Sequence, residues 1–272
     1  MTKAFIKMHG LGNDFAIFDG RHEKLDIGPE QIRALADRRL GIGFDQMVVI
    51  DPPKSPETDA FLRIYNADGG EVGACGNATR CIGKLLIAEL GKPEVMLETV
   101  AAKLTAKMAG DKVCVDMNEA KVKWQEIPIS REEKTEFLPI NEDVLQQPVA
   151  VNMGNPHAVF FVEKAANVPL ETLGPKIEHH PLFPERTNVE VAQVISPTEI
   201  RMRVWERGAG ITQACGTGAC ATAVAGVRRG LTERKVTVIL DGGTLEIEWR
   251  ESDGHVLMTG DAVEVYRGTV DV

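Results

Sequence analysis

Two stretches of the sequence follow one pattern: residues 63–76 read RIYNADGGEVGACG, and residues 203–216 read RVWERGAGITQACG. Both contain Arg, a branched aliphatic residue, an aromatic residue, Gly, Ala, Cys and Gly in the same order, at a constant offset of 140 positions. Short matches that contain glycine also arise by chance, so the pair needs support from the rest of the chain. If it reflects a duplication, each copy belongs to one half of a two-domain protein.

Flanking positions supply that support. Asn13 and Asn155 each follow a glycine and precede an apolar run, and Gln46 and Asn188 also precede apolar runs. Each of these two pairs is separated by 142 positions, close to the offset of the first match. A long unit that occurs twice is typical of two domains with one fold, whereas a solenoid stacks many short repeats.

The length of the chain agrees with this division. A chain of 272 residues is near the size at which one core gives way to two, and each half would be an ordinary domain. We expect domains at residues 1–118 and 119–262, with a polar, Glu-rich linker at Gln125–Glu142.

Composition excludes several classes of protein. Hydrophobic residues make up 43% of the chain, which is enough for a globular core, and 31 Lys and Arg against 40 Asp and Glu give a net charge of −9. An acidic chain without a basic run is a poor candidate for binding nucleic acid or an anionic membrane surface. No window approaches 18 apolar residues, and we expect no membrane span and no membrane partner.

The cysteines indicate a reducing compartment. Their number is odd, they form no CxxC pair, and the chain shows no secretory signal, so we expect thiols in a cytoplasmic protein. No phosphate-binding glycine loop or HExxH motif stands out, and we expect no metal site.

Hydrophobic patterns predict a mixture of strands and a few helices. Helices are expected at about Pro29–Arg39, Asn77–Leu90 and Thr217–Arg229, the last two ending at glycines. The expected strands are Phe5–Met8, Phe15–Asp19, Met47–Ile50, Phe61–Tyr65, Val95–Glu98, Lys103–Met108, Val113–Met117, Val149–Val151, Ala158–Val162, Val189–Val194, Arg201–Trp205, Val236–Leu240, Leu245–Trp249 and His255–Met258. The fold class is therefore α+β: two pseudo-symmetric domains of similar fold, each a curved, mostly antiparallel sheet around a central helix.

Cys75 and Cys215 are the candidate catalytic residues. Each follows a loop and opens an apolar helix, where unpaired N–H groups and the helix dipole favour anions and thiolates. If the two domains face each other across a cleft, one thiolate can remove a proton from a substrate carbon while the other thiol returns one. This is the chemistry of a racemase or epimerase. The remaining cysteines, Cys81, Cys114 and Cys220, are interpreted as packing residues.

Polar residues beside these helix starts suit an amino-acid ligand. Neutral amides at strand edges can donate to carboxylates and accept from ammonium groups, although each is also a common turn residue. Arg207 breaks the internal symmetry and can clamp a carboxylate through two parallel hydrogen bonds. His157 is a second asymmetric charge, with a structural role as the alternative.

Six motifs together resemble the diaminopimelate epimerase family along essentially the whole chain. They are HGLGNDF at residues 9–15, ACGN at 74–77, GNPH at 154–157, RTN at 186–188, ERG at 206–208 and ACGTG at 214–218. The resemblance implies interconversion of LL- and meso-2,6-diaminoheptanedioate without pyridoxal phosphate, metal or other cofactor, in lysine and peptidoglycan precursor synthesis. It also implies two α+β domains with the active site in the cleft between them, and a C-terminal strand at 263–272 that returns to the first domain.

The same resemblance assigns residues to roles. Cys75 and Cys215 would be the acid–base pair, with Cys75 the donor and Cys215 the acceptor for the LL substrate, and His157 and Glu206 would modulate them. Tyr266 matches a tyrosine at the contact of a homodimer. The residues implied to bind substrate are Asn13, Gln46, Asn66, Gly76, Asn77, Asn155, Asn188, Glu206, Arg207, Gly216 and Thr217.

Three alternatives remain open at this point. A related two-cysteine racemase would act on proline or hydroxyproline, but a proline has no second amino-acid head for Arg207 and Asn188 to hold. A non-catalytic relative would normally have lost one or both cysteines. A thiol redox protein would use Cys75 and Cys215 as a disulfide pair.

Overall fold

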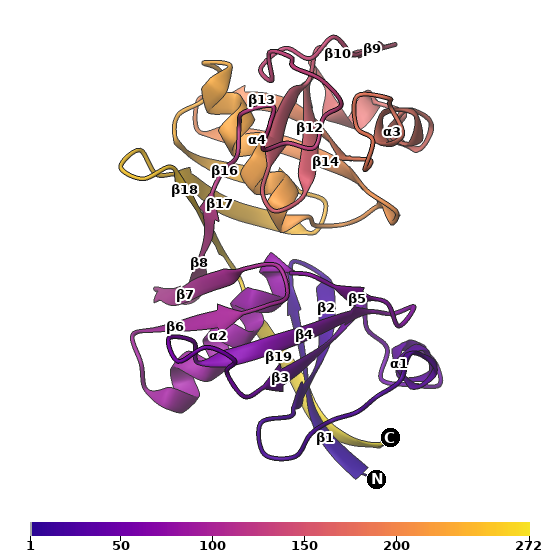
Figure 1. The fold of residues 1–272 in the computed structure, drawn as a ribbon, viewed down its shortest axis with the longest axis vertical. Helices are drawn as coiled ribbons and strands as arrows, with labels where there is room; N and C mark the ends of the chain where they lie inside the picture. Colours follow the sequence, from indigo (N-terminus) through magenta and orange to yellow (C-terminus); the bar gives the residue numbers. More distant parts are fainter. Residues whose placement is uncertain (1) are drawn as a thin grey trace. The chain divides into compact units, whose positions relative to one another are not determined.

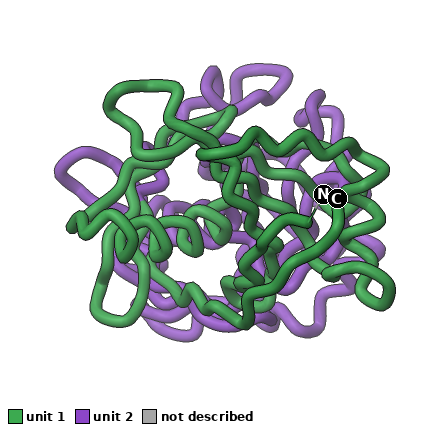
Figure 2. The backbone as a smooth tube through the Cα atoms, turned by 90° about the horizontal axis from the view of Figure 1, so that it is seen from below, with its two compact units in different colours: residues 1–115, 259–272 green, residues 116–258 purple. Residues whose placement is uncertain are grey.

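The computed structural model describes residues 2–272, which form two compact units (Figure 2). Unit 1 comprises the chain up to Val115 together with Thr259–Val272, and unit 2 comprises Asp116–Met258. The chain leaves unit 1 within β8 (Lys112–Glu119) and re-enters it within β18 (His255–Gly260).

Unit 1 is a curved sheet with one long helix packed against it. The long helix is α2 (Gly76–Leu90). Besides β8 and β18, the remaining elements of unit 1 are β1 (Thr2–Gly10), β2 (Asn13–Asp19), α1 (Pro29–Ala36), β3 (Gln46–Asp51), β4 (Ala60–Asn66), β5 (Glu71–Val72), β6 (Glu94–Glu98), β7 (Lys103–Ala109) and β19 (Val263–Asp271). The pairs β2–β3 and β4–β6 are parallel, and the pairs β1–β19, β1–β2, β3–β4, β4–β5 and β6–β7 are antiparallel.

Unit 2 repeats this order of elements, with a two-stranded hairpin and a 3₁₀ turn added. They are β9 (Asn141–Glu142), β10 (Leu145–Gln146), β11 (Val149–Asn152), β12 (Pro156–Phe161), the 3₁₀ turn η1 (Ala165–Asn167), α3 (Leu170–Glu178), β13 (Asn188–Ser196), β14 (Glu199–Glu206), β15 (Gly210–Ile211), α4 (Gly216–Arg228), β16 (Lys235–Leu240) and β17 (Gly243–Trp249). Here β12–β13 and β14–β16 are parallel, and β11–β12, β13–β14, β14–β15 and β16–β17 are antiparallel.

The register of the strands repeats as well as their order. The pairing of β2 with β3 matches that of β12 with β13, and the pairing of β3 with β4 matches that of β13 with β14. The matched partners are Phe15 with Gln46 and His157 with Asn188, then Met47 with Tyr65 and Val189 with Trp205. The predicted α+β class and the duplicated fold are confirmed.

One central helix anchors the core of each unit. In Figure 1, α2 lies against strands of unit 1 and α4 against those of unit 2; α2 contacts β1, β6 and β7, whereas α4 contacts β11, β12, β13, β14, β16 and β17. Ala, Gly, Val and Cys fill most of α4, and these small side chains let six strands approach it closely. The left-handed Gly91 ends α2 by donating its N–H to Ile87, as predicted.

The predicted linker is wrong. Residues 125–142 lie inside unit 2, and Ile127, Leu138 and Ile140 are buried in its core. Glu126 and Glu132 are exposed and the other Glu residues of the segment are partly exposed, so a Glu-rich composition hid the buried apolar residues between them. The helix predicted to reach Arg39 ends at Ala36, because the Asp37 carboxylate accepts hydrogen bonds from the backbone of Arg39 and Leu40 and turns the chain.

Among residues 2–272, no helix is both long enough and apolar enough to cross a membrane.

Candidate active site

In unit 1, the topology gathers polar residues at one edge of the sheet. Parallel β2 and β3 begin there and antiparallel β4 ends there, which places Asn13, Gln46 and Asn66 at that edge. Cys75 is the residue preceding the first turn of α2, and its extended backbone (φ −149°, ψ 113°) directs the chain into the helix. No side chain of residues 2–272 caps the helix there, so its first N–H groups remain suited to an anion.

Hydrogen bonds join these side chains. The Cys75 thiol lies 3.8 Å from Asn13 Oδ1, and Asn77 Nδ2 donates to the same oxygen at 3.1 Å. Gln46 Nε2 donates to Asn66 Oδ1 at 2.9 Å. Four amides and one half-buried thiol therefore form two connected groups within unit 1.

A buried arginine supports this arrangement. Arg80 is 0% exposed, and its Nη2 donates to Asn77 Oδ1 at 2.9 Å while its Nε donates to the Asp261 carbonyl at 3.3 Å. Since Asn77 Oδ1 accepts from Arg80, Asn77 Nδ2 is the group left to face Asn13. The guanidinium thus orients the first turn of α2.

In unit 2, equivalent positions hold a more acidic set. Asn188 begins β13, Glu206 ends β14, and Cys215 precedes α4 with the same extended backbone (φ −121°, ψ 108°). The Cys215 thiol lies 3.6 Å from Thr217 Oγ1. Glu206 accepts a hydrogen bond from Thr212 Oγ1 and another from the Cys215 thiol.

The electrostatics of this group favour protonated forms. Burial raises the pKa of the Cys215 thiol well above its usual value, and the carboxylates of Glu206 and Glu190 raise it further. Burial also raises the pKa of Glu206, while the hydrogen bonds from Thr212 and Cys215 oppose that rise. Burial therefore holds both the thiol and the neighbouring carboxyl toward their protonated forms.

His157 is fully buried between two acceptors. Its Nδ1 lies 2.7 Å from Glu190 Oε1, and its Nε2 lies 2.9 Å from Asn155 Oδ1. The three residues form a chain from the middle of the sheet to the turn that precedes β12.

The turn that carries Glu206 and Arg207 is held by backbone contacts. Asn188 Oδ1 accepts from the Arg207 N–H at 2.9 Å, and Asn188 Nδ2 donates to the Pro156 carbonyl at 2.9 Å. The Arg207 guanidinium is exposed, and its Nη1 donates to the Glu185 carbonyl at 3.0 Å.

The other cysteines lie away from these helix starts. Burial raises the pKa of the Cys81 thiol to about 12, which suits a packing residue and not a proton carrier. Cys114 and Cys220 are also buried, and all five cysteines are thiols. Within residues 2–272, no three His, Cys, Asp or Glu side chains are grouped to hold a metal ion.

Comparison with known proteins shows the family of this chain. The model of the family described as diaminopimelate epimerase matches residues 5–123 and 149–265. The chain belongs to the diaminopimelate epimerase family. Membership makes it an isomerase, an amino-acid epimerase.

Two curated members of the diaminopimelate epimerase family show how complete the match is. The protein of that name from Rhodospirillum centenum is 52% identical over 269 residues, which cover 98% of this chain and 92% of its own. The one from Caulobacter vibrioides strain NA1000 is 50% identical over 280 residues, covering 98% and 97%. Among solved structures, a hydroxyproline epimerase from Agrobacterium vitis has a TM-score of 0.70 at 16% identity, covering 99% and 91% of the two chains; this likeness shows a shared fold alone.

Sequence reasoning missed three buried charges beside the candidate residues: Arg80, Glu178 and Glu190. Each forms a hydrogen bond with a candidate site residue or with the turn that carries one, and none is among the residues implied to bind substrate. No motif for substrate binding therefore points to these three residues. Glu190 was detectable in principle, because a carboxylate between two valines of an apolar strand requires a buried partner.

Proposed function

We propose that this chain interconverts LL- and meso-2,6-diaminoheptanedioate by a two-base mechanism, without pyridoxal phosphate or another cofactor, and that it serves the synthesis of lysine and of peptidoglycan precursors. The observation that carries the proposal is the repeated placement of a cysteine directly before a central helix, at Cys75 and at Cys215. The substrate is the one named by relatives with about half of their residues identical.

The reaction needs one thiolate and one thiol. The thiolate takes the hydrogen from the α-carbon as a proton, and the electron pair of that C–H bond stays on the carbon beside the carboxylate. The second thiol then gives its proton to the opposite face of that carbon and becomes the thiolate. Atoms and charge balance without an added reagent, and the roles of the cysteines exchange in the reverse direction.

For the LL substrate, Cys75 is the proposed donor and Cys215 the proposed acceptor. Cys215 must first lose its proton, and Glu206 is the group beside it that can take one, since its own pKa is raised by burial. The N–H groups at the two helix starts, including those of Gly76 and Gly216, stabilise the negative charge that spreads onto the carboxylate.

Recognition of the substrate is proposed to use the amides and Arg207. Amide groups of Asn13, Asn77 and Asn155 bind the carboxylate and ammonium of the reacting end, together with Gln46, Asn66 and Thr217. Arg207, Glu206 and Asn188 bind the distal amino-acid group, which proline lacks. This distal group is why the proline or hydroxyproline racemase activity is the less favoured alternative.

The proposed location is the cytoplasm, and the proposed assembly is a homodimer. Five thiols suit a reducing compartment. Tyr266 is 45% exposed on β19, next to the exposed Val265, and its ring packs edge-on against Phe5. An exposed apolar strand of this kind suits a contact with a second copy, and light scattering of the purified chain measures that state.

The test is incubation of reduced, metal-free protein with LL-diaminopimelate in deuterated water, followed by chiral analysis. We expect the meso product with deuterium at the inverted carbon. Cys75→Ala and Cys215→Ala are each expected to abolish inversion, whereas Cys81→Ala, a matched change at a packing cysteine, retains it. Normal turnover by either of the first two variants, or inversion without deuterium, rules out the two-base mechanism.

A further inference from the structure

Glu190 is a buried carboxylate without an assigned role. It lies on β13 and is 0% exposed; its Oε1 contacts His157, and its Oε2 has no hydrogen-bond partner among the described residues. An ionised carboxylate in such a place is costly unless an opposite charge lies against it. His157, which is also 0% exposed, is the ionisable base in contact with it.

The hydrogen-bond geometry indicates the protonation of His157. A carboxylate oxygen only accepts, so Nδ1 must donate to Glu190; Asn155 Oδ1 also only accepts, so Nε2 must donate to Asn155. A ring that donates from both nitrogens is an imidazolium. In this arrangement the proton shared with Glu190 is the one on Nδ1 of the ring, and the carboxylate accepts it as a hydrogen bond.

The chain of contacts ends at a group that faces a ligand in the proposed reaction. With Asn155 Oδ1 held by His157, the NH₂ group of Asn155 is turned away from the ring, and no acceptor within the described residues binds it. We propose that Glu190 is a positioning residue that holds His157 as a buried imidazolium. The Nε2–H of that ring orients the Asn155 amide. The NH₂ group of Asn155 then donates to the substrate carboxylate. This inference rests on the proposed function, since it takes Asn155 as a substrate contact.

The neighbours of the pair are themselves acidic. The charge of Glu190 raises the pKa of Glu206 on β14 and of Cys215 at the start of α4. The charge of His157 lowers the pKa of Glu206. A Cβ on Gly218 would stand 2.8 Å from Glu190 Oε1 and 3.3 Å from the Cys215 sulfur. The absence of a side chain at Gly218 therefore leaves room for both the carboxylate and the thiol beside the start of α4. A positive ring here offsets the acidic groups around it.

Nitrogen NMR of protein labelled with ¹⁵N-histidine tests the proposal directly, with His157→Asn to identify the signals. In the unaltered chain at pH 7.5, both ring nitrogens of His157 are expected to carry protons. In Glu190→Gln, which keeps the shape and loses the charge, one nitrogen is expected to lose its proton. The KM for diaminopimelate should then rise about tenfold, the cost of one weakened hydrogen bond to a charged group, with kcat changed less than about threefold.

Two further variants make the result decisive. Glu190→Asp keeps the carboxylate and is expected to keep both ring protons. Glu163→Gln removes an exposed charge just beyond the far end of β12 and is expected to alter neither the spectrum nor KM. A single protonated nitrogen in the unaltered chain overturns the proposal even if Glu190→Gln does not fold, and an unchanged KM in folded Glu190→Gln overturns the positioning role. Absence of activity on diaminopimelate in the unaltered chain would count against the proposed function alone, because the NMR result does not depend on turnover.

Discussion

Around Cys215, single side chains decide the chemistry of one thiol. Burial is the largest influence on its pKa, and Glu206 and Glu190 act in the same direction, whereas the Thr217 hydroxyl and the Gly218 N–H oppose them. Both opposing groups stabilise a thiolate, so they assist whichever step forms one. The balance leaves Cys215 as a thiol until a neighbouring base acts on it.

Replacing Glu206 with Gln tests how much this carboxylate raises the pKa of Cys215. A negative neighbour disfavours the thiolate, so Glu206→Gln is expected to lower the pKa of Cys215 and to move its ionisation midpoint to lower pH by about one unit. Thiolate absorbance during a pH titration, with Cys215→Ala as the blank, measures the midpoint. Glu199→Gln, at the other end of β14, should leave it unchanged. A midpoint that stays or moves to higher pH would contradict the assignment.

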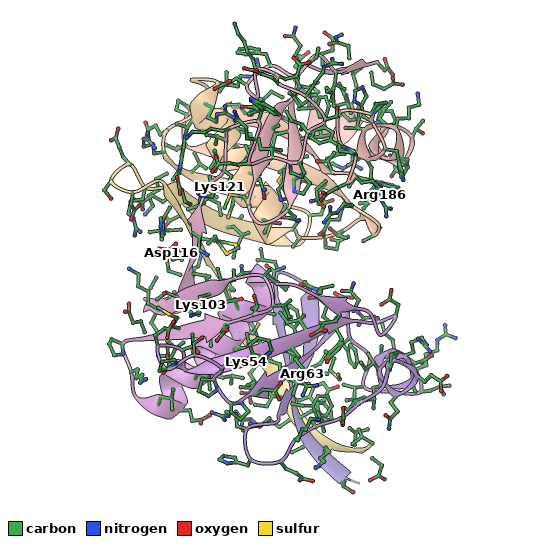
Figure 3. The ribbon with its side chains drawn as sticks, viewed as in Figure 1. Lys54, Arg63, Lys103, Asp116, Lys121 and Arg186 are labelled. Carbon is green, nitrogen blue, oxygen red and sulfur yellow. The ribbon has the colours of Figure 1, made fainter. Side chains whose placement is uncertain are left out.

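At the scale of elements, α3 supports the turn that carries Glu206 and Arg207. The buried Glu178 at its end accepts from Trp205 Nε1 at 2.7 Å and from the Gly208 N–H at 3.0 Å. Arg186, labelled in Figure 3, lies 3.5 Å from the same carboxylate. One side chain thus ties the helix to both sides of the turn.

Glu178→Gln is expected to loosen that turn. The amide replaces one acceptor oxygen with a donor, so a hydrogen bond from Trp205 or Gly208 is lost, which costs about 1–2 kcal/mol of unfolding free energy. The KM for diaminopimelate should rise more than kcat falls, because Arg207 is proposed to bind the substrate. Urea unfolding and steady-state kinetics measure the two effects. Glu171→Gln, exposed on the same helix, is the matched control, and equal effects of the two changes would refute this role.

At the scale of the whole molecule, the two ends of the chain complete one unit. Figure 1 shows β19 beside β1, and the two pair antiparallel from Thr2 with Asp271 to His9 with Val263. The carbonyls just before β19 accept hydrogen bonds from Arg80 and Lys84 of α2. Unit 1 therefore depends on residues that are synthesised last.

Deletion of residues 263–272 is expected to destabilise unit 1 selectively. The deletion exposes the edge of β1 and uncovers Phe5, whose ring packs on Gly268 and Tyr266, at a cost of about 3 kcal/mol or more. Amide hydrogen exchange followed by mass spectrometry should show lost protection in unit 1 and retained protection in Asp116–Met258. Removal of residue 272 alone serves as the control. Equal loss of protection in both units would contradict the selective effect.

The sequence was a good guide where local signals and global fold agree. The paired offsets predicted the duplication, and the glycines at the helix ends predicted where α2 and α4 stop, because a left-handed residue after a helix is a local property of glycine. It was a poor guide at residues 125–142, where scattered apolar residues enter a core that only the folded unit provides.

By itself, the sequence determined the family, the repeated fold and the two cysteines before the central helices, since these follow from residue order and short-range geometry. Only the tertiary structure decided which charges are buried and against what. Arg80, Glu178 and Glu190 contact partners up to 181 positions away in the sequence, and a hydrogen bond across such a separation depends on strand register and helix packing. Those buried charges orient the amides and the turn that the sequence had already singled out.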